Sequence, residues 1–92
     1  MKTRISQAQV GERLRLLRLA KGYEEQKEWA TRIGVSLSRY NNWECGRQII
    51  TLENASRIAE LTGSSLDYIY LGDESALSRN LLGLIETHSK KS

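Results

Sequence analysis

Apolar residues recur at helical spacing in successive short segments of the chain. Between residues 7 and 20, Val10, Leu14 and Leu17 fall at i, i+4 and i+7, which places them on one face of a helix. Similar patterns, bounded by glycine or by a capping serine or threonine, predict five further helices at about 24–33, 37–45, 51–62, 65–72 and 73–87. Helices this short are marginal alone and must pack on one another, so the pattern predicts an all-α fold.

The segment 26–44 consists of two amphipathic helices separated by the three-residue turn Gly34-Val35-Ser36. Gly34 can adopt the left-handed conformation that an abrupt helix end requires, and Ser36 is a suitable N-cap for the next helix. Ala30 is small enough for that helix to cross the preceding one closely. Two helices packed steeply around such a turn are typical of proteins whose second helix enters a DNA groove.

The second of these helices, 37–45, has an inner and an outer side. Its aromatic residues are expected to fill the wedge between the two helices, with partners from the first helix and the turn: Trp29, Ile33, Val35, Tyr40 and Trp43. The outer positions are then Leu37, Ser38, Asn41 and Asn42, with Arg39 at the flank. Asparagine can pair with N6 and N7 of adenine, serine can donate or accept, and leucine can cover a thymine methyl group. The alternative is a merely solvated helix face, but the glycine turn and the small residue before it favour DNA.

Charge and composition permit this function without requiring it. The 92 residues carry a net charge of +3, and residues 1–21 contain six basic residues but a single acidic one. The lone Cys45 cannot form an intramolecular disulfide, and no apolar run is long enough to span a bilayer, so we expect a cytoplasmic protein without membrane contact. Paired carboxylates, a metal-ligand cluster, a phosphate-binding loop and a catalytic triad are all missing from the sequence. We therefore expect no enzyme, no metal and no cofactor.

The C-terminal segment 73–87 carries an apolar stripe formed by Leu77, Leu81, Leu84 and Ile85. Two interpretations of the stripe remain open. It can form the contact between two copies of the chain, or it can pack back onto the chain's own first and fifth helices. We expect a flexible N-terminal arm at 1–6, a DNA-binding domain at 7–72 and a disordered tail at 88–92.

Three stretches give the chain a family resemblance: VGERLRLLRLAKG (10–22), WATRIGVSLSRYNNWECGR (29–47) and TLENASRIAELTGSSLDYIYLG (51–72). The chain resembles the helix-turn-helix domain of the phage repressor and Cro class, within the xenobiotic-response-element family of bacterial regulators. The resemblance implies a five-helix bundle like that of the lambda repressor, here with an extra C-terminal helix. It also implies that 37–45 is the recognition helix.

The same resemblance assigns roles to individual residues. It places Leu37, Ser38 and Asn42 at base edges, with Ser36 beside them, and it places Gln26 and Arg47 at phosphates. It further implies an ion pair between Arg18 and Glu44 that holds the first helix to the recognition helix. The chain departs from the family pattern at Glu24-Glu25, where acid precedes Gln26, and at Leu37, where a polar residue is usual.

These features predict a transcriptional regulator, most simply a repressor that binds a palindromic operator in double-stranded DNA as a homodimer. One alternative is the antitoxin of a toxin–antitoxin pair, which would also bind a partner protein through the C-terminal helix. A second alternative is an interaction module that keeps the fold but does not bind DNA.

Overall fold

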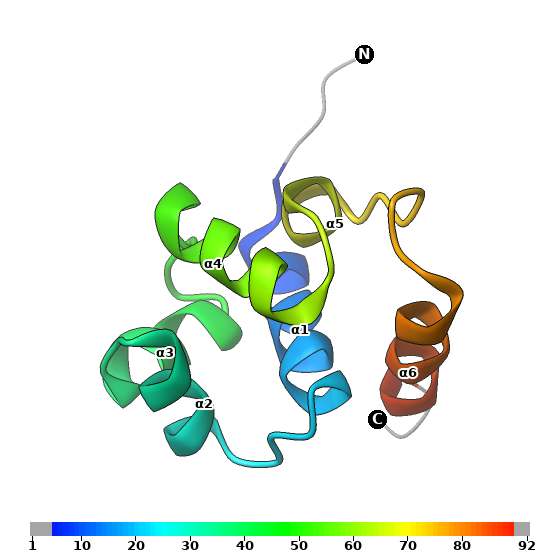
Figure 1. Cartoon of the computed structure of the whole chain (residues 1–92). Coiled ribbons are helices and arrows are strands. Elements are labelled where there is room, and N and C mark those ends of the chain that lie inside the picture. The colour runs from blue at the N-terminus through cyan, green and yellow to red at the C-terminus, as the bar shows by residue number, and fades with distance from the viewer. Residues whose placement is uncertain (1–4, 90–92) are drawn as a thin grey trace.

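The computed structural model describes residues 5–89, and in this range the helices, joined by turns and loops, are the regular secondary structure. Its six helices in this range are α1 (Gln7–Ala20), α2 (Gln26–Ile33), α3 (Leu37–Glu44), α4 (Leu52–Thr62), α5 (Leu66–Leu71) and α6 (Arg79–Ser89). Helix α1 occupies the middle of the bundle, with α2 and α3 on one side of it and α6 on the other (Figure 1). The predicted all-α fold is confirmed.

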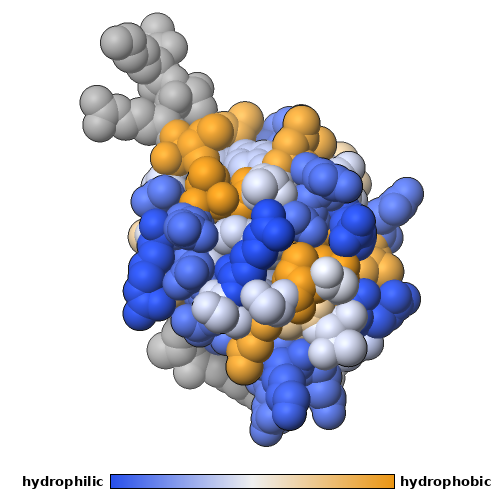
Figure 2. Space-filling model, turned by 90° about the vertical axis from the view of Figure 1, so that its left-hand side faces the viewer, coloured by the Kyte–Doolittle hydropathy of each residue, from blue (hydrophilic) through white to orange (hydrophobic). Residues whose placement is uncertain are grey.

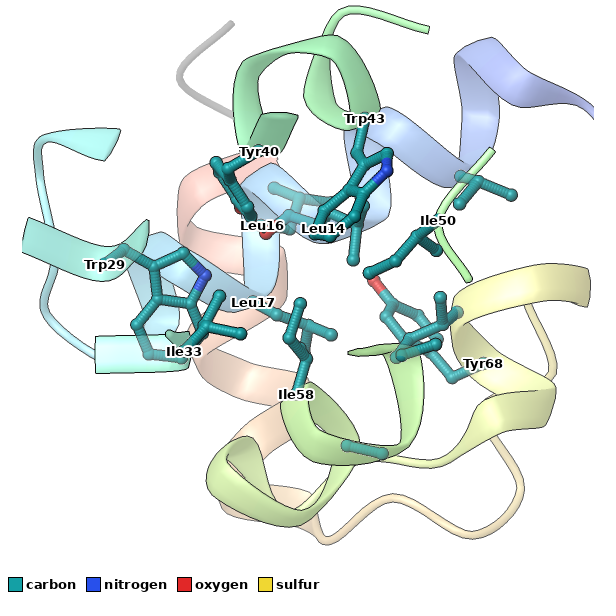
Figure 3. Packing of buried hydrophobic residues seen from close by; sticks show 14 of the residues in the cluster. Leu14, Leu16, Leu17, Trp29, Ile33, Tyr40, Trp43, Ile50, Ile58 and Tyr68 are labelled. Atoms are coloured by element: carbon teal, nitrogen blue, oxygen red, sulfur yellow. Dashed lines mark hydrogen bonds between the residues drawn. The ribbon is translucent and has the colours of Figure 1, made fainter. Parts of the chain in front are cut away.

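The core is built around the apolar face of α1, as its spacing predicted. Leu14 and Leu17 are fully buried, and side chains from α2, α3, α4, α5 and the connection between α3 and α4 close over them (Figure 3). The largest of these partners are Trp29, Ile33, Tyr40, Trp43, Ile50, Ile58 and Tyr68. The two helices of the helix-turn-helix segment therefore contribute one tryptophan each to the same core.

Helix α2 begins at Gln26, two residues later than the sequence pattern predicted. The guanidinium of Arg18 donates to the carbonyl oxygens of Tyr23 and Glu24 at 2.8 and 2.7 Å. Those bonds tie the segment before α2 to the side of α1, and Glu25 adopts an extended conformation as the N-cap. The acidic residues Glu24 and Glu25 therefore precede the helix instead of forming its first turn.

Helix α6 begins at Arg79 and not at Asp73, as was predicted. The carboxylate of Asp73 accepts hydrogen bonds from the N–H and the hydroxyl of Ser75 at 2.9 and 2.6 Å, which forms a local turn in place of a first helical turn. The hydroxyl of Ser78 then accepts from the N–H of Leu81. Leu77 consequently lies in the connecting turn rather than on the helix.

The C-terminal boundary also differs from the prediction. Helix α6 continues to Ser89, so His88 is helical instead of belonging to a tail. The remainder of the predicted tail, 90–92, and most of the predicted N-terminal arm, 1–4, lie outside the described residues.

Gly11 is where α1 and α3 approach most tightly. A Cβ atom added to Gly11 would lie 2.3 Å from the carbonyl oxygen of Glu44 and 2.7 Å from that of Trp43. Only a residue without a side chain fits there. The C-terminal end of α3 is thereby seated directly on the backbone of α1.

Candidate nucleic-acid interface

Helices α2 and α3 are joined by a turn whose conformation follows from its sequence. Gly34 has φ of 91° in the left-handed region, and its N–H donates to the carbonyl oxygen of Ala30. Ser36 is extended, and its hydroxyl accepts from the N–H of Arg39, which caps α3. The predicted turn chemistry therefore matches the observed geometry.

Helix α3 buries one side and exposes the other, as its pattern predicted. Tyr40 and Trp43 lie in the core, whereas Ser38 and Arg39 are exposed and Leu37 keeps 46% of its surface accessible. Figure 2 shows the side of the molecule that carries α2 and α3 in Figure 1, and its surface is mostly hydrophilic with separate small hydrophobic areas. This composition suits contact with a polar, charged partner more than burial against an apolar one.

An ion pair between Arg18 and Glu44 joins α1 to α3. The two closest atoms, Nε and Oε2, are 2.7 Å apart, and Nη2 donates to Oε1 at 3.2 Å. The side chains are only 7% and 5% exposed. Burial alone would lower the pKa of Arg18, but the hydrogen bonds and charge of Glu44 outweigh it and raise the pKa. The guanidinium of Arg18 therefore stays charged.

Tyr40 adds its hydroxyl to this buried pair. Its Oη donates to Oε2 of Glu44 at 2.6 Å, one helical turn further along α3. Burial raises the pKa of Tyr40 strongly, and the negative charge of Glu44 raises it further. Sequence analysis assigned Tyr40 only to the core, although its i, i+4 spacing to Glu44 was the available signal for this contact.

Glu44 also fixes the orientation of two amide side chains. A carboxylate only accepts, so the group of Gln26 that faces it must be the amino group, and Nε2 lies 2.8 Å from Oε1 of Glu44. The remaining Oε1 of Gln26 accepts from Nδ2 of Asn41 at 2.9 Å. Both side chains are half-buried in this network. Neither Gln26 nor Asn41 was assigned an internal role from the sequence.

The network bears on the predicted phosphate contact at Gln26. Its side chain is hydrogen-bonded at both ends within the protein, and the donors that stay available are the second N–H of Nε2 and the backbone N–H. The first turn of α2 has no side-chain cap, and a helix N-terminus of this kind favours an anion. A phosphate contact through the side chain or the backbone N–H of Gln26 therefore remains the prediction at this position.

Arg47 and Asn42 are also brought together by the chain. The Nη1 atom of Arg47 donates to Oδ1 of Asn42 at 3.2 Å. Within α3 the guanidinium of Arg39 lies over the ring of Trp43, 5.5 Å from its centroid. Both arginines remain exposed beside the outer side of α3.

Other basic side chains are engaged elsewhere. Arg13 donates to the carbonyl oxygen of Ile69, and Arg57 donates to that of Ile33 at the end of α2. Arg15 pairs with Glu12 on the surface of α1 at 2.7 Å. These contacts within the protein stabilise helix ends and a helix surface.

Among residues 5–89 no group of three or more metal-ligating side chains is present. Cys45 is an exposed free thiol. In the same range no helix is both long and apolar enough to cross a membrane.

The fold and the exposed side of α3 define a helix-turn-helix DNA-binding domain. The chain belongs to the helix-turn-helix family of the Cro/C1 type, whose family model matches residues 14–69. Searches of the curated proteins and of the solved structures gave no match. The protein is thus a DNA-binding transcriptional regulator, and its family is typically not enzymatic.

The structure divides the predicted C-terminal stripe into two parts. Leu77, Leu81 and Ile85 are buried within the chain, where α6 packs on α1. Leu84 keeps 38% of its surface exposed. For three of the four residues the structure thus shows the internal packing that was one of the two interpretations.

Proposed function

We propose that this protein is a repressor that binds a palindromic operator as a homodimer and inserts α3 of each subunit into a major groove. The observation that carries the proposal is the contrast between the two sides of α3. Its inner side is fixed to α1 and α2 by the buried contacts of Glu44, and its outer side presents Leu37, Ser38 and Asn42. Side chains that contact bases need such a rigid support.

Backbone phosphates would be bound on both sides of α3. The uncapped N-terminus of α2 lies before it, and Arg47 follows it. Contacts of this type position a protein on DNA without reading the sequence, whereas the outer side chains of α3 would supply the base contacts. A binder that neutralises several phosphates loses affinity steeply as salt rises.

The proposed contact between two subunits lies on α6. A palindromic operator requires two copies related by a two-fold axis, with recognition helices about 34 Å apart. Because its three partners in the stripe are buried, Leu84 is the stripe residue available for contact with a second copy. We propose that Leu84 lies in the dimer interface.

Selection of bound sequences from a random duplex library tests the proposal. We expect an inverted repeat whose half-sites are centred about 10 base pairs apart, and binding that weakens steeply with salt. Direct regulation would then be measured with a reporter gene placed behind the selected operator, and repression is expected. Recovery of no enriched sequence, or binding that does not respond to salt, would sink the proposal.

The antitoxin alternative keeps DNA binding and adds a second activity, the neutralisation of a partner protein. It needs a protein partner bound outside the DNA interface, and α6 is where we would place it. Co-expression with the product of a neighbouring small gene, followed by co-purification and a growth assay, distinguishes the two. Rescue of growth from a toxic partner would favour the antitoxin, while repression without any such partner favours the repressor.

A further inference from the structure

Asn42 and Arg47 form one small unit on the outer side of α3. The backbone N–H groups of Arg47 and Gln48 donate to the carbonyl oxygen of Asn42 at 3.0 and 3.1 Å, so the chain after α3 folds back over this residue. The Nη1 atom of Arg47 then reaches the side-chain oxygen of Asn42 at 3.2 Å. One backbone bond and one side-chain bond therefore join Arg47 to Asn42, and the bond from Gln48 holds the chain in the same turn.

This contact determines which end of the Asn42 amide faces outward. A guanidinium donates from every nitrogen and accepts nowhere, so the atom of Asn42 that faces Arg47 must be the oxygen. The amino group Nδ2 then points away, and within residues 5–89 no acceptor is hydrogen-bonded to it. The remaining N–H groups of Arg47 are exposed as well. The outer surface of the pair consists of hydrogen-bond donors.

The neighbouring Asn41 shows that this orientation comes from the partner and not from the residue type. Its Nδ2 is directed inward to Gln26, which is itself oriented by the buried carboxylate of Glu44. Its oxygen is therefore the end left toward the surface, where the exposed thiol of Cys45 donates to it at 4.0 Å. Two adjacent asparagines are held in opposite senses, one by an acceptor and the other by a donor.

Bases differ in the major groove in the same property. Guanine presents two acceptors, N7 and O6, whereas adenine presents the acceptor N7 beside the donor N6. Adenine would have to direct its N6 amino group at the second lone pair of an oxygen that already accepts from Arg47, and the positive charge of the guanidinium repels that amino group. Guanine can accept from Nδ2 of Asn42 without sharing that oxygen. The adenine pairing that asparagine alone suggests is therefore disfavoured.

We infer that Asn42 selects guanine by donating from Nδ2, and that Arg47 is the positioning residue that sets the orientation of Asn42. The inference deepens the proposed function and rests on it, because α3 must enter the major groove for the pair to meet a base.

The test is a selection of bound duplexes with the full-length wild type and three variants: Asn42→Ala, Arg47→Met and, as a matched control far from α3, Arg79→Met. The base contacted by Asn42 is the one whose preference disappears in Asn42→Ala. We expect the wild type to prefer guanine over adenine there about tenfold. Arg47→Met should reduce that preference to less than about threefold or turn it toward adenine, and Arg79→Met should leave it unchanged.

Arg47 is exposed, so the substitution should leave the fold intact, which circular dichroism would verify. Loss of one phosphate contact would lower affinity for all sequences alike, and the relative preference between bases separates that loss from a change in orientation. A wild type that prefers adenine at the Asn42 position, or an Arg47→Met protein that keeps the full preference for guanine, overturns the inference but not the proposed function. A wild type that enriches no sequence overturns both.

Discussion

Glu44 is the residue on which most contacts around α3 converge. Its two oxygens accept from Arg18 on α1, from Gln26 on α2 and from Tyr40 on α3 itself. A carboxylate buried to this degree is tolerated only because its charge and both its oxygens are satisfied. The residue therefore connects three helices at one point.

Removal of that carboxylate should be costly. In Glu44→Ala the guanidinium of Arg18 stays buried without its partner, and breaking one side of a buried pair typically lowers the free energy of unfolding by about 3–5 kcal/mol. Urea titration followed by circular dichroism measures this. Glu12→Ala is the matched control, because it breaks the exposed pair with Arg15 and should lower the value by less than about 1 kcal/mol. Equal losses in the two variants would contradict the role assigned to Glu44.

Tyr68 should make stability depend on alkaline pH. Burial raises the pKa of its hydroxyl from 10.0 to about 12. The folded protein keeps this proton where the unfolded chain has lost it, so the stabilisation is complete below pH 10 and disappears as the pH rises toward 12. Over this window the wild type should lose up to about 1.4 kcal/mol per pH unit relative to Tyr68→Phe. Urea midpoints of both proteins below and above pH 10 measure the difference, and parallel curves would count against it.

At the scale of helices, the seat of α3 on α1 depends on Gly11. Sequence analysis predicted most helix ends correctly because caps and glycine stops are local signals. It misplaced the start of α2 because that start depends on the contact of Arg18 with two carbonyl groups. It misplaced the start of α6 because Asp73 forms a local turn with Ser75, which the spacing of apolar residues does not reveal. The close approach at Gly11 was not predicted either, since a glycine inside a helix does not reveal from sequence what lies beside it.

Two glycine substitutions compare a closely packed glycine, Gly11, with an unobstructed one, Gly83. Gly11→Ala places a methyl group 2.3 Å from a backbone oxygen of α3, so α3 must move and the free energy of unfolding should fall by about 1–3 kcal/mol. Gly83→Ala on α6 meets nothing within 4 Å and should instead raise it by about 0.5–1 kcal/mol. Thermal or urea unfolding gives both values. The same sign for both substitutions would be inconsistent with the close packing at Gly11.

At the scale of the whole molecule, α1 separates the side that carries α2 and α3 from α6 (Figure 1). The fold class could be predicted from the sequence because each helix carries its own apolar stripe, and these stripes pack together in one core. The candidate site followed only in part. The outer positions of α3 could be read from its period, whereas the orientation of Gln26, Asn41 and Asn42 depends on partners that are distant in sequence or that follow the helix.

The dimer contact can be tested without disturbing the core. Leu84→Glu introduces a charge on the exposed part of α6 and should convert the proposed dimer to a monomer, which light scattering coupled to size exclusion would show. Leu52→Glu changes another exposed leucine on α4 and should leave the mass unchanged. Truncation after Gly72 is less suitable, because it would also uncover the surface of α1 on which α6 packs. A Leu84→Glu protein with the mass of the wild type would place the interface elsewhere.

The split between the fixed inner side of α3 and its open outer side has a consequence for how such a protein acquires new targets. The contacts of Glu44 hold the helix without using Leu37, Ser38 or Asn42. Substitutions at those three positions can thus change the preferred operator while the scaffold keeps its stability. Asn42 differs from the other two because its side chain is held by Arg47, five residues further along the chain. Retargeting at that position calls for the two residues to change together, so positions 42 and 47 form a single unit of specificity.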